Sequence, residues 1–293
     1  MNDFIAECAP HDHNPVKPRF TPPPHSCDVH AHVCGPYDQY PLLPERLYNP
    51  PLASVHDYVG MLDALGIERG VLVQPSVYGV DNSAMLDALK LFPQRLRGVA
   101  VVKQDVSVED LQQMHKVGVR GVRINIVDLK NNKGKLPLDD IRRLAEKIKP
   151  LSWHIEFLMH TNEFPNLEQD LGDLPVDLVF GHLGYVPTKE GLHTQGFESL
   201  IRLVKAKKAW IKLTAPYRLT LNHLPYPDVN AFADRLVSEV SDRLIWGSDW
   251  PHVFIKTPMP NDGELFNIFT DWVRSPELVK KILVDNPKTL YDF

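Results

Sequence analysis

Short runs of consecutive apolar residues alternate along this chain with longer stretches in which apolar residues recur every three or four positions. The runs are rich in Val, Ile and Leu, which is typical of strands buried on both faces of a parallel sheet. Eight such runs occur, at 27–33, 70–76, 96–102, 118–126, 153–159, 177–183, 210–214 and 244–249. The helical spacing predicts helices at 81–91, 108–117, 138–148, 197–205, 229–240 and 263–273.

Regular alternation of strand and helix predicts an α/β fold in which crossover helices join parallel strands. Eight repeats favour closure into a (β/α)8 TIM barrel, regular or distorted, and an open doubly wound sheet is the alternative. Two long connections, 35–54 and 215–228, follow the first and seventh strands, on the side where barrel enzymes carry their active sites. The last segment, 276–293, predicts a helix pair against the outside of the barrel.

Composition narrows the class of protein. Residues 1–25 are rich in proline and predict an extended arm, followed by one barrel domain over 26–293. The net charge of −5 and the lack of a basic run argue against a nucleic-acid partner. No apolar segment reaches the roughly 20 residues of a membrane helix, and the first residues lack the apolar core of a signal peptide.

The cysteines indicate the compartment. There are three, Cys8, Cys27 and Cys34, and no Cys-x-x-Cys pair occurs. An odd number without that motif is typical of reduced thiols, so we expect a cytoplasmic protein. The sequence is compatible with a homo-oligomer and does not specify one.

Candidate catalytic residues stand at the ends of three strands. In the first strand, Asp28-Val29-His30-Ala31-His32, the two histidines are two positions apart and therefore face the same side. His182 follows the sixth strand and Asp249 follows the eighth. Each residue alone could be structural, as a hydrogen-bonded histidine or a helix cap. Together they predict a cluster at the barrel mouth, suited either to a divalent metal or to polarising an oxygen.

Two arginines predict an anionic substrate. Arg123 ends the fourth strand and Arg218 lies in the loop after the seventh, so both belong to the predicted active face. A guanidinium group fits a carboxylate well. Each could instead pair with a neighbouring acid on the surface, and Arg120 could replace Arg123 as the gripping residue. Glu156, in the fifth strand, has no assigned role, because its side chain could point into the mouth, into a buried hydrogen-bonded position or outward.

The chain resembles the amidohydrolase-2 branch of the amidohydrolase superfamily from about residue 18 to its end. The most specific stretch is Trp246-Gly247-Ser248-Asp249-Trp250-Pro251-His252, and weaker ones are 19–24, 74–76, 79–82, 121–125, 153–154 and 260–263. Within the branch, the resemblance is to lactonases that act on pyrone dicarboxylates. It implies a hydrolase that opens the ring of a carboxylated lactone, in the bacterial breakdown of aromatic or sugar acids.

The resemblance also implies roles for individual residues. Asp249 would be the general base that activates water, and His30, His32 and His182 would polarise the lactone carbonyl or hold the water. Arg123 and Arg218 would grip substrate carboxylates. The remaining predicted substrate contacts are Tyr48, Ser76, Tyr185 and His252.

Departures from the lactonase pattern broaden the expected substrate range. Tyr185 stands where those lactonases carry an arginine, and the basic residues after the fourth strand are displaced to Lys130 and Lys133. Fewer guanidinium groups leave 2-pyrone-4,6-dicarboxylate, muconolactone-type, sulfonated and sugar-acid lactones all open as substrates.

The cofactor requirement follows from the same residues. We expect no cofactor to be required, since a lactone is an activated ester and the resemblance implies metal-free chemistry. The alternative is one Zn²⁺ held by the three histidines and Asp249. A zinc-dependent decarboxylase, a lactone isomerase and a non-catalytic binding barrel are the competing functions.

Overall fold

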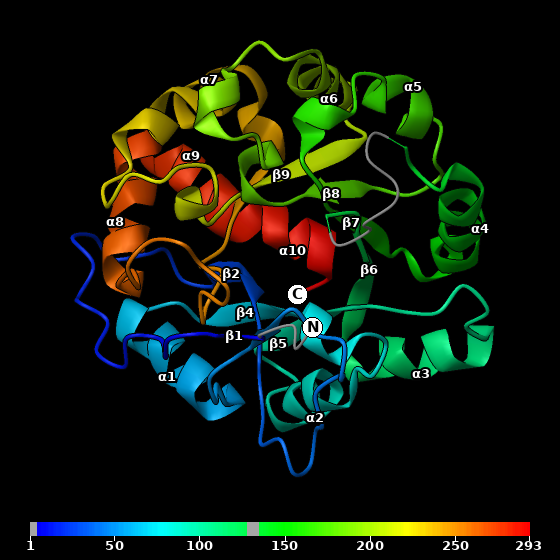
Figure 1. The fold of residues 1–293 in the computed structure, drawn as a ribbon. Coiled ribbons are helices and arrows are strands. Elements are labelled where there is room, and N and C mark those ends of the chain that lie inside the picture. The colour runs from blue at the N-terminus through cyan, green and yellow to red at the C-terminus, as the bar shows by residue number, and fades with distance from the viewer. Residues whose placement is uncertain (1–4, 128–134) are drawn as a thin grey trace.

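Eight parallel strands form the centre of the molecule, and the computed structural model describes residues 5–127 and 135–293 (Figure 1). The strands are β2 (Cys27–Ala31), β4 (Arg69–Val73), β5 (Leu96–Ala100), β6 (Val119–Asn125), β7 (His154–Leu158), β8 (Leu178–Phe180), β9 (Ala209–Leu213) and β10 (Leu244–Trp246). Each strand pairs with its neighbour in sequence, in the order β10-β9-β8-β7-β6-β5-β4-β2. All eight predicted strands are therefore present.

The two edge strands of this sheet meet, which closes it into a barrel. Ala31 forms a parallel bridge with Trp250, and the backbone N–H of Asp249 donates to the carbonyl of His30 at 2.8 Å. Gly247 permits the approach, because a Cβ there would lie only 2.8 Å from the Cβ of His30. The prediction of a (β/α)8 barrel is confirmed, and the open doubly wound sheet is wrong.

Helices surround the barrel: α1 (Val55–Leu65), α2 (Ser83–Leu91), α3 (Val108–Val117), α4 (Leu138–Ile148), α5 (Leu167–Leu171), α6 (Gln195–Lys205), α7 (Asn230–Val240) and α8 (Asp262–Trp272). Local sequence sets their ends. Helix α3 starts where the Ser107 hydroxyl accepts from the Asp110 N–H, and it stops at Gly118 with φ 118°. The six predicted helices match within two residues, whereas α1 and the short α5 were not predicted.

Alternate residues along each strand face opposite layers of apolar packing. Val71, Val99 and Ile245 belong to a buried cluster with the residues that fill the barrel interior. Residues one position along, such as Leu72 and Leu244, pack in the larger cluster beneath the helices. Burial on both faces explains why the strands read as continuous apolar runs.

The C-terminal segment closes one end of the barrel. It comprises α9 (Pro276–Lys280), a π-helical turn (Lys281–Asp285) and α10 (Asn286–Tyr291). Tyr291 is fully buried in the interior cluster, and its ring contacts that of His154 at the start of β7. The prediction that this helix pair covers the outside is wrong for α10, because its apolar residues fill the end of the barrel where the strands begin.

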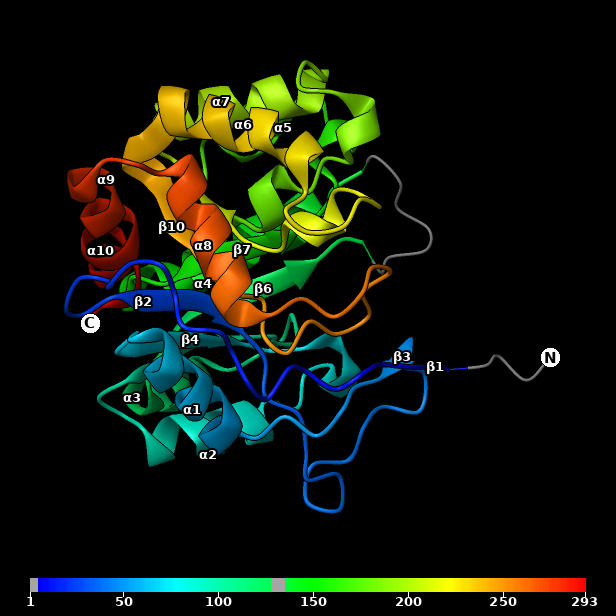
Figure 2. The same cartoon turned by 90° about the vertical axis from the view of Figure 1, so that its left-hand side faces the viewer.

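The position of α10 also excludes Arg120 as a substrate-gripping residue. Arg120 forms an ion pair of 3.1 Å with Asp292, directly after α10. Figure 2 shows α9 and α10 at one end of the barrel, while the loops that follow the strands lie at the other.

Residues 5–25 run in an extended path over the barrel. A short strand β1 (Ala6–Glu7) pairs in parallel with β3 (Tyr48–Asn49), in the long loop after β2. Further along, the His11 ring packs on Trp250, and the Val16 N–H donates to Asn261 beside α8. Among the described residues, no helix has both the length and the apolar character needed to cross a membrane.

Candidate active site

A cavity of about 120 Å³ opens at the end of the barrel where the strands finish. Eight of the predicted site residues line it: His32, Tyr48, Ser76, Arg123, His182, Tyr185, Arg218 and Asp249. His30 lies directly behind this wall, with its side chain almost fully buried. The structure thus brings together residues from most of the strand ends, where active sites of barrel enzymes lie.

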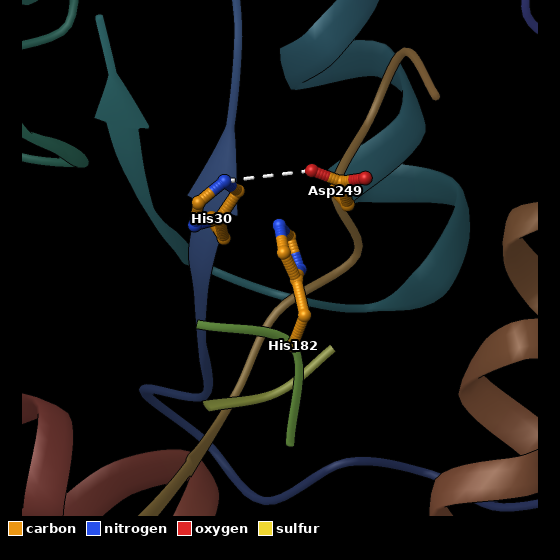
Figure 3. A group of neighbouring side chains, drawn as sticks. All are labelled: His30, His182 and Asp249. Carbon is orange, nitrogen blue, oxygen red and sulfur yellow. Dashed lines mark ion pairs between the residues drawn. The ribbon is translucent and has the colours of Figure 1, made fainter. Parts of the chain in front are cut away.

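Three side chains converge on one point in the cavity wall (Figure 3). One ring nitrogen each of His30 and His182 and one carboxylate oxygen of Asp249 all lie within 4.8 Å of one another. His30 Nε2 is 3.4 Å from Asp249 Oδ1, and neither these two atoms nor His182 Nδ1 has a hydrogen-bond partner among the described residues. Buried polar atoms without partners are uncommon, so a group of them beside a cavity is a candidate binding site.

His32 approaches the same carboxylate oxygen from the other side. Its Nδ1 lies 2.7 Å from the carbonyl oxygen of Val73 and must donate to it, because a carbonyl can only accept. In the neutral ring, the lone pair therefore sits on Nε2, which is 3.7 Å from Asp249 Oδ1.

Backbone conformation aims several of these side chains. His182 (φ 52°), Asp249 (φ 67°) and His252 (φ 60°) adopt left-handed conformations that residues other than glycine rarely take. Each costs on the order of 1–3 kcal/mol, and such residues cluster at functional sites.

Asp28 fixes the position of the loop that carries Asp249. Its Oδ1 accepts from the backbone N–H groups of His30 and Ser248, and its Oδ2 accepts from the Ser248 hydroxyl. Burial raises the pKa of Asp28 to about 6, despite these hydrogen bonds. The carboxyl group thereby ties β2 to the loop after β10.

The second oxygen of Asp249 is fully engaged. Oδ2 accepts from the Tyr217 hydroxyl and from Arg218 Nε, both at 2.8 Å, and it forms an ion pair with Arg218 Nη2 at 2.7 Å. Burial alone would raise the pKa of Asp249, but the Arg218 guanidinium, with the nearby histidines, outweighs it and holds the pKa well below its usual value. Asp249 is therefore a carboxylate with one oxygen anchored and the other free.

This contact revises the expected role of Arg218. The sequence predicted that it grips a substrate carboxylate, but two of its nitrogens bind Asp249, and Nη2 also donates to the carbonyl of Val253. Arg218 lines the cavity, yet its guanidinium is paired with the Asp249 carboxylate.

His252 also has a different position from the one predicted. Its side chain is fully buried and is not among the described residues that line the cavity. Its Nδ1 lies 2.8 Å from the Tyr217 hydroxyl and its Nε2 lies 3.0 Å from Asp262 Oδ1. A chain of hydrogen bonds thus runs from Asp262 through His252 and Tyr217 to Asp249, so His252 lies behind the carboxylate and outside the lining of the cavity.

A buried ion pair lies behind His30. Lys212, on β9, donates to Glu156 Oε2 at 2.6 Å, and both side chains are at most 2% exposed. Glu156 therefore takes the buried, hydrogen-bonded position, one of the three that the sequence left open. Burial, reinforced by the Lys212 ammonium, lowers the pKa of His30 to about 3, so the ring is neutral near pH 7.

Sequence reasoning missed Lys212, Tyr217 and Asp262. Lys212 was detectable as the one charged residue within the apolar run 210–214, and Tyr217 stands next to a predicted site residue. Asp262 lies in the weak resemblance stretch 260–263 and at the start of a predicted helix, but neither feature shows that its side chain contacts His252.

Arg123 supplies positive charge to the cavity. Its Nη1 donates to the carbonyl of Gln74 at 2.9 Å, and no carboxylate of the described residues forms an ion pair with it. Tyr185 packs edge-on to His182, with ring centroids 5.2 Å apart, where the lactonase pattern has an arginine. Lys130 and Lys133 lie outside the described residues.

A buried carboxylate, three imidazoles and a guanidinium that forms no ion pair with a described carboxylate lie together at the barrel mouth. Enzymes use such groups to add water to a carbonyl group. A model of the amidohydrolase family matches residues 27–293. The chain belongs to this family, as the resemblance predicted.

Two characterised relatives match nearly the whole chain. The 2-pyrone-4,6-dicarboxylate hydrolase of Comamonas testosteroni is 38% identical and covers 95% of this chain and 93% of its own. The 4-sulfomuconolactone hydrolase of Hydrogenophaga intermedia is 37% identical, with 99% and 98% covered. The crystal structure of a probable 2-pyrone-4,6-dicarboxylic acid hydrolase from Acinetobacter baumannii, with citric acid bound, superposes with a TM-score of 0.81 at 29% identity over 92% of this chain and 100% of that one.

Proposed function

We propose that the protein hydrolyses a lactone that carries an anionic group, with Asp249 as the base that activates water. The observation that carries the proposal is the asymmetric environment of this carboxylate, in which Oδ2 is held by Tyr217 and Arg218 while Oδ1 faces the histidines. The two characterised relatives, both hydrolases of lactones with acidic substituents by name, support the same class of reaction.

The reaction follows from the positions of these groups. A water between Asp249 Oδ1 and His32 Nε2 gives a proton to the carboxylate and attacks the lactone carbonyl carbon. The resulting oxyanion is stabilised by N–H donors of the neighbouring imidazoles. Collapse of the tetrahedral intermediate breaks the ring C–O bond, and Asp249 returns its proton to the leaving oxygen. The product is the ring-opened hydroxy acid or its tautomer.

Arg123 is the proposed anchor for the anionic substituent. It lines the cavity together with Ser76 and Tyr48, and it carries no ion pair with the described carboxylates. Carboxylate and sulfonate both accept two parallel hydrogen bonds from a guanidinium. The substrate class is therefore 2-pyrone-4,6-dicarboxylate, a carboxylated or sulfonated muconolactone, or a sugar-acid lactone.

A divalent cation is the alternative for the same cluster. One nitrogen or oxygen atom from each of His30, His182 and Asp249 lies close enough to the others to hold one, so the donor set fits Zn²⁺. When bound, such a cation would supply a Lewis acid for the carbonyl oxygen. The steps above use only the groups of the chain, and we propose that they suffice.

A lactone panel tests the proposal. Each compound is mixed with the purified protein at low buffer concentration, and proton release is followed with and without a chelator after metal analysis. Hydrolysis that persists in the chelated, metal-free protein supports the proposal. Carbon dioxide release dependent on zinc would replace it with a decarboxylase, and conversion without proton release would replace it with an isomerase.

A further inference from the structure

Lys212 is buried in the barrel interior, with three polar atoms within hydrogen-bonding distance of its ammonium nitrogen. Nζ lies 2.6 Å from Glu156 Oε2, 2.8 Å from the carbonyl oxygen of Val29 and 3.1 Å from His30 Nδ1. The side chain is fully buried. Burying a charged lysine costs desolvation free energy unless its partners compensate for the lost water. The partners of Lys212 therefore indicate its role.

The contact with His30 fixes which ring nitrogen carries the proton. An ammonium group has three donors and no acceptor, so a contact of 3.1 Å is favourable only if His30 Nδ1 presents its lone pair. The proton of the neutral ring then sits on Nε2. The opposite tautomer would set an N–H against the ammonium, although Glu156 Oε1, 3.2 Å from the same Nδ1, could accept from it.

We propose that Lys212, held in place by Glu156, is a positioning residue that keeps His30 in the Nε2–H tautomer and so makes it an obligate hydrogen-bond donor to the reacting carbonyl. The role of His30 as a donor to the carbonyl rests on the proposed function, whereas the assignment of the tautomer rests only on the contacts of Lys212. Nε2 has no other partner among the described residues and lies on the side of the ring that faces Asp249.

The result is a division of labour between the two histidines of the first strand. His32 donates through Nδ1 to Val73, so its Nε2 accepts from water, whereas His30 donates through Nε2 to the carbonyl oxygen. In this arrangement the His32 ring binds the water and the His30 ring binds the substrate carbonyl. A cation bound at His30 Nε2 would need the lone pair on that nitrogen, which is the tautomer that Lys212 disfavours.

Nitrogen-15 NMR of histidine-labelled protein tests the tautomer directly. The His30 signals are those missing from a His30→Asn variant. The proposal predicts a protonated Nε2 and an unprotonated Nδ1 in the metal-free wild type. A protonated Nδ1 overturns it and identifies Glu156 as the acceptor. This readout is independent of activity, so it stands even if no lactone in the panel is hydrolysed.

A double variant, Lys212→Met with Glu156→Gln, tests the cause. It removes both charges together, which avoids leaving one buried and unpaired. We expect the His30 signals to shift towards the other tautomer, and kcat to fall by roughly 10–100-fold with KM nearly unchanged, somewhat less than for outright loss of an oxyanion donor. Wild-type signals and kcat in this variant overturn the proposal. If it does not fold, the wild-type spectrum decides alone.

His154→Gln is the matched control. His154 is buried on the same strand as Glu156, two positions away, and its ring nitrogens have no hydrogen-bond partners among the described residues. This change perturbs the barrel interior at a residue that forms no hydrogen bond or ion pair with Lys212 or His30 among the described residues. The His30 signals and kcat should match the wild type, and a change as large as that of the double variant would assign both effects to general loosening of the interior, against the proposal.

Discussion

Replacing Arg218 by alanine separates the two roles that this residue could have. If its guanidinium gripped the substrate, the variant would bind substrate weakly and turn it over normally. The structure instead places two of its nitrogens on Asp249 Oδ2, within 2.8 Å. Since Asp249 keeps only Tyr217 on that oxygen in the variant, we expect kcat to fall and KM to change little.

The magnitude follows from the burial of the pair. Asp249 is 1% exposed and the Arg218 side chain 14% exposed, so removal of Arg218 leaves a buried carboxylate without its cation. Breaking such a pair costs about 3–5 kcal/mol, and the partial exposure of Arg218 places the expected loss near the lower end. A base displaced by about 1 Å loses on the order of 100-fold in rate, which is the fall that we expect in kcat.

The effect depends on pH with a defined sign. In the wild type the folded-state pKa of Asp249 is depressed, so the pair stabilises the protein above the unfolded pKa of about 3.9, and this contribution is lost as the pH falls through the folded value. Without Arg218, burial raises the folded pKa. The difference in unfolding free energy between wild type and variant should therefore be largest near neutral pH and should narrow on acidification.

Denaturant unfolding at several pH values, together with pH–rate profiles, provides the assay. The acid limb of kcat/KM should move to higher pH in the variant. Arg19→Ala is the control, because its ion pair with Asp271 is exposed and should contribute only about 0–1 kcal/mol. A raised KM with unchanged kcat and an unmoved acid limb would refute the reasoning and restore Arg218 as the carboxylate-gripping residue.

Three further substitutions test other parts of the account. Asp249→Asn should lower kcat by roughly 10²–10⁴-fold, the contribution typical of a general base, while calorimetry shows little change in substrate affinity; substantial turnover would remove Asp249 from that role. Arg123→Ala should raise KM by about 10–100-fold, corresponding to a charged hydrogen bond worth about 1.5–3 kcal/mol, with lysine restoring part of it; an unchanged KM would show that the anion binds elsewhere. Tyr291→Ala should cost about 3–5 kcal/mol of stability in thermal unfolding, with kcat of the folded protein unchanged, because α10 closes the end of the barrel away from the site; an unchanged melting temperature would contradict that packing.

The strands and most helices could be predicted because their periodicity depends only on local burial. Helices α3 and α4 match to the residue, since Ser107 and Gly118 punctuate one of them and a strong apolar stripe defines the other. The place of α10 could not be predicted in the same way. An apolar helix face shows that the helix packs against another apolar surface, but it does not identify that surface. Only the assembled barrel shows that the surface is the end of the barrel where the strands begin.

The residues of the catalytic cluster were also predictable, because strand ends in a barrel meet at one mouth. The partners of Arg218 and His252 were not. Both lie in loops after strands, and the direction of a loop side chain is set by the tertiary contacts available to it. Arg218 pairs with Asp249, and His252 is held between the Tyr217 hydroxyl and the Asp262 carboxylate.

The central claim is that Asp249 delivers water to a lactone carbonyl, and isotope labelling tests it most directly. A lactone found active in the panel is incubated in H₂¹⁸O with wild-type protein and with Asp249→Asn, and the product is analysed by mass spectrometry after a single turnover. The account predicts one ¹⁸O atom in the newly formed carboxylate of the wild-type product and almost no product from the variant. A wild-type product with the mass of the substrate and no ¹⁸O, or equal labelling by both proteins, would contradict it.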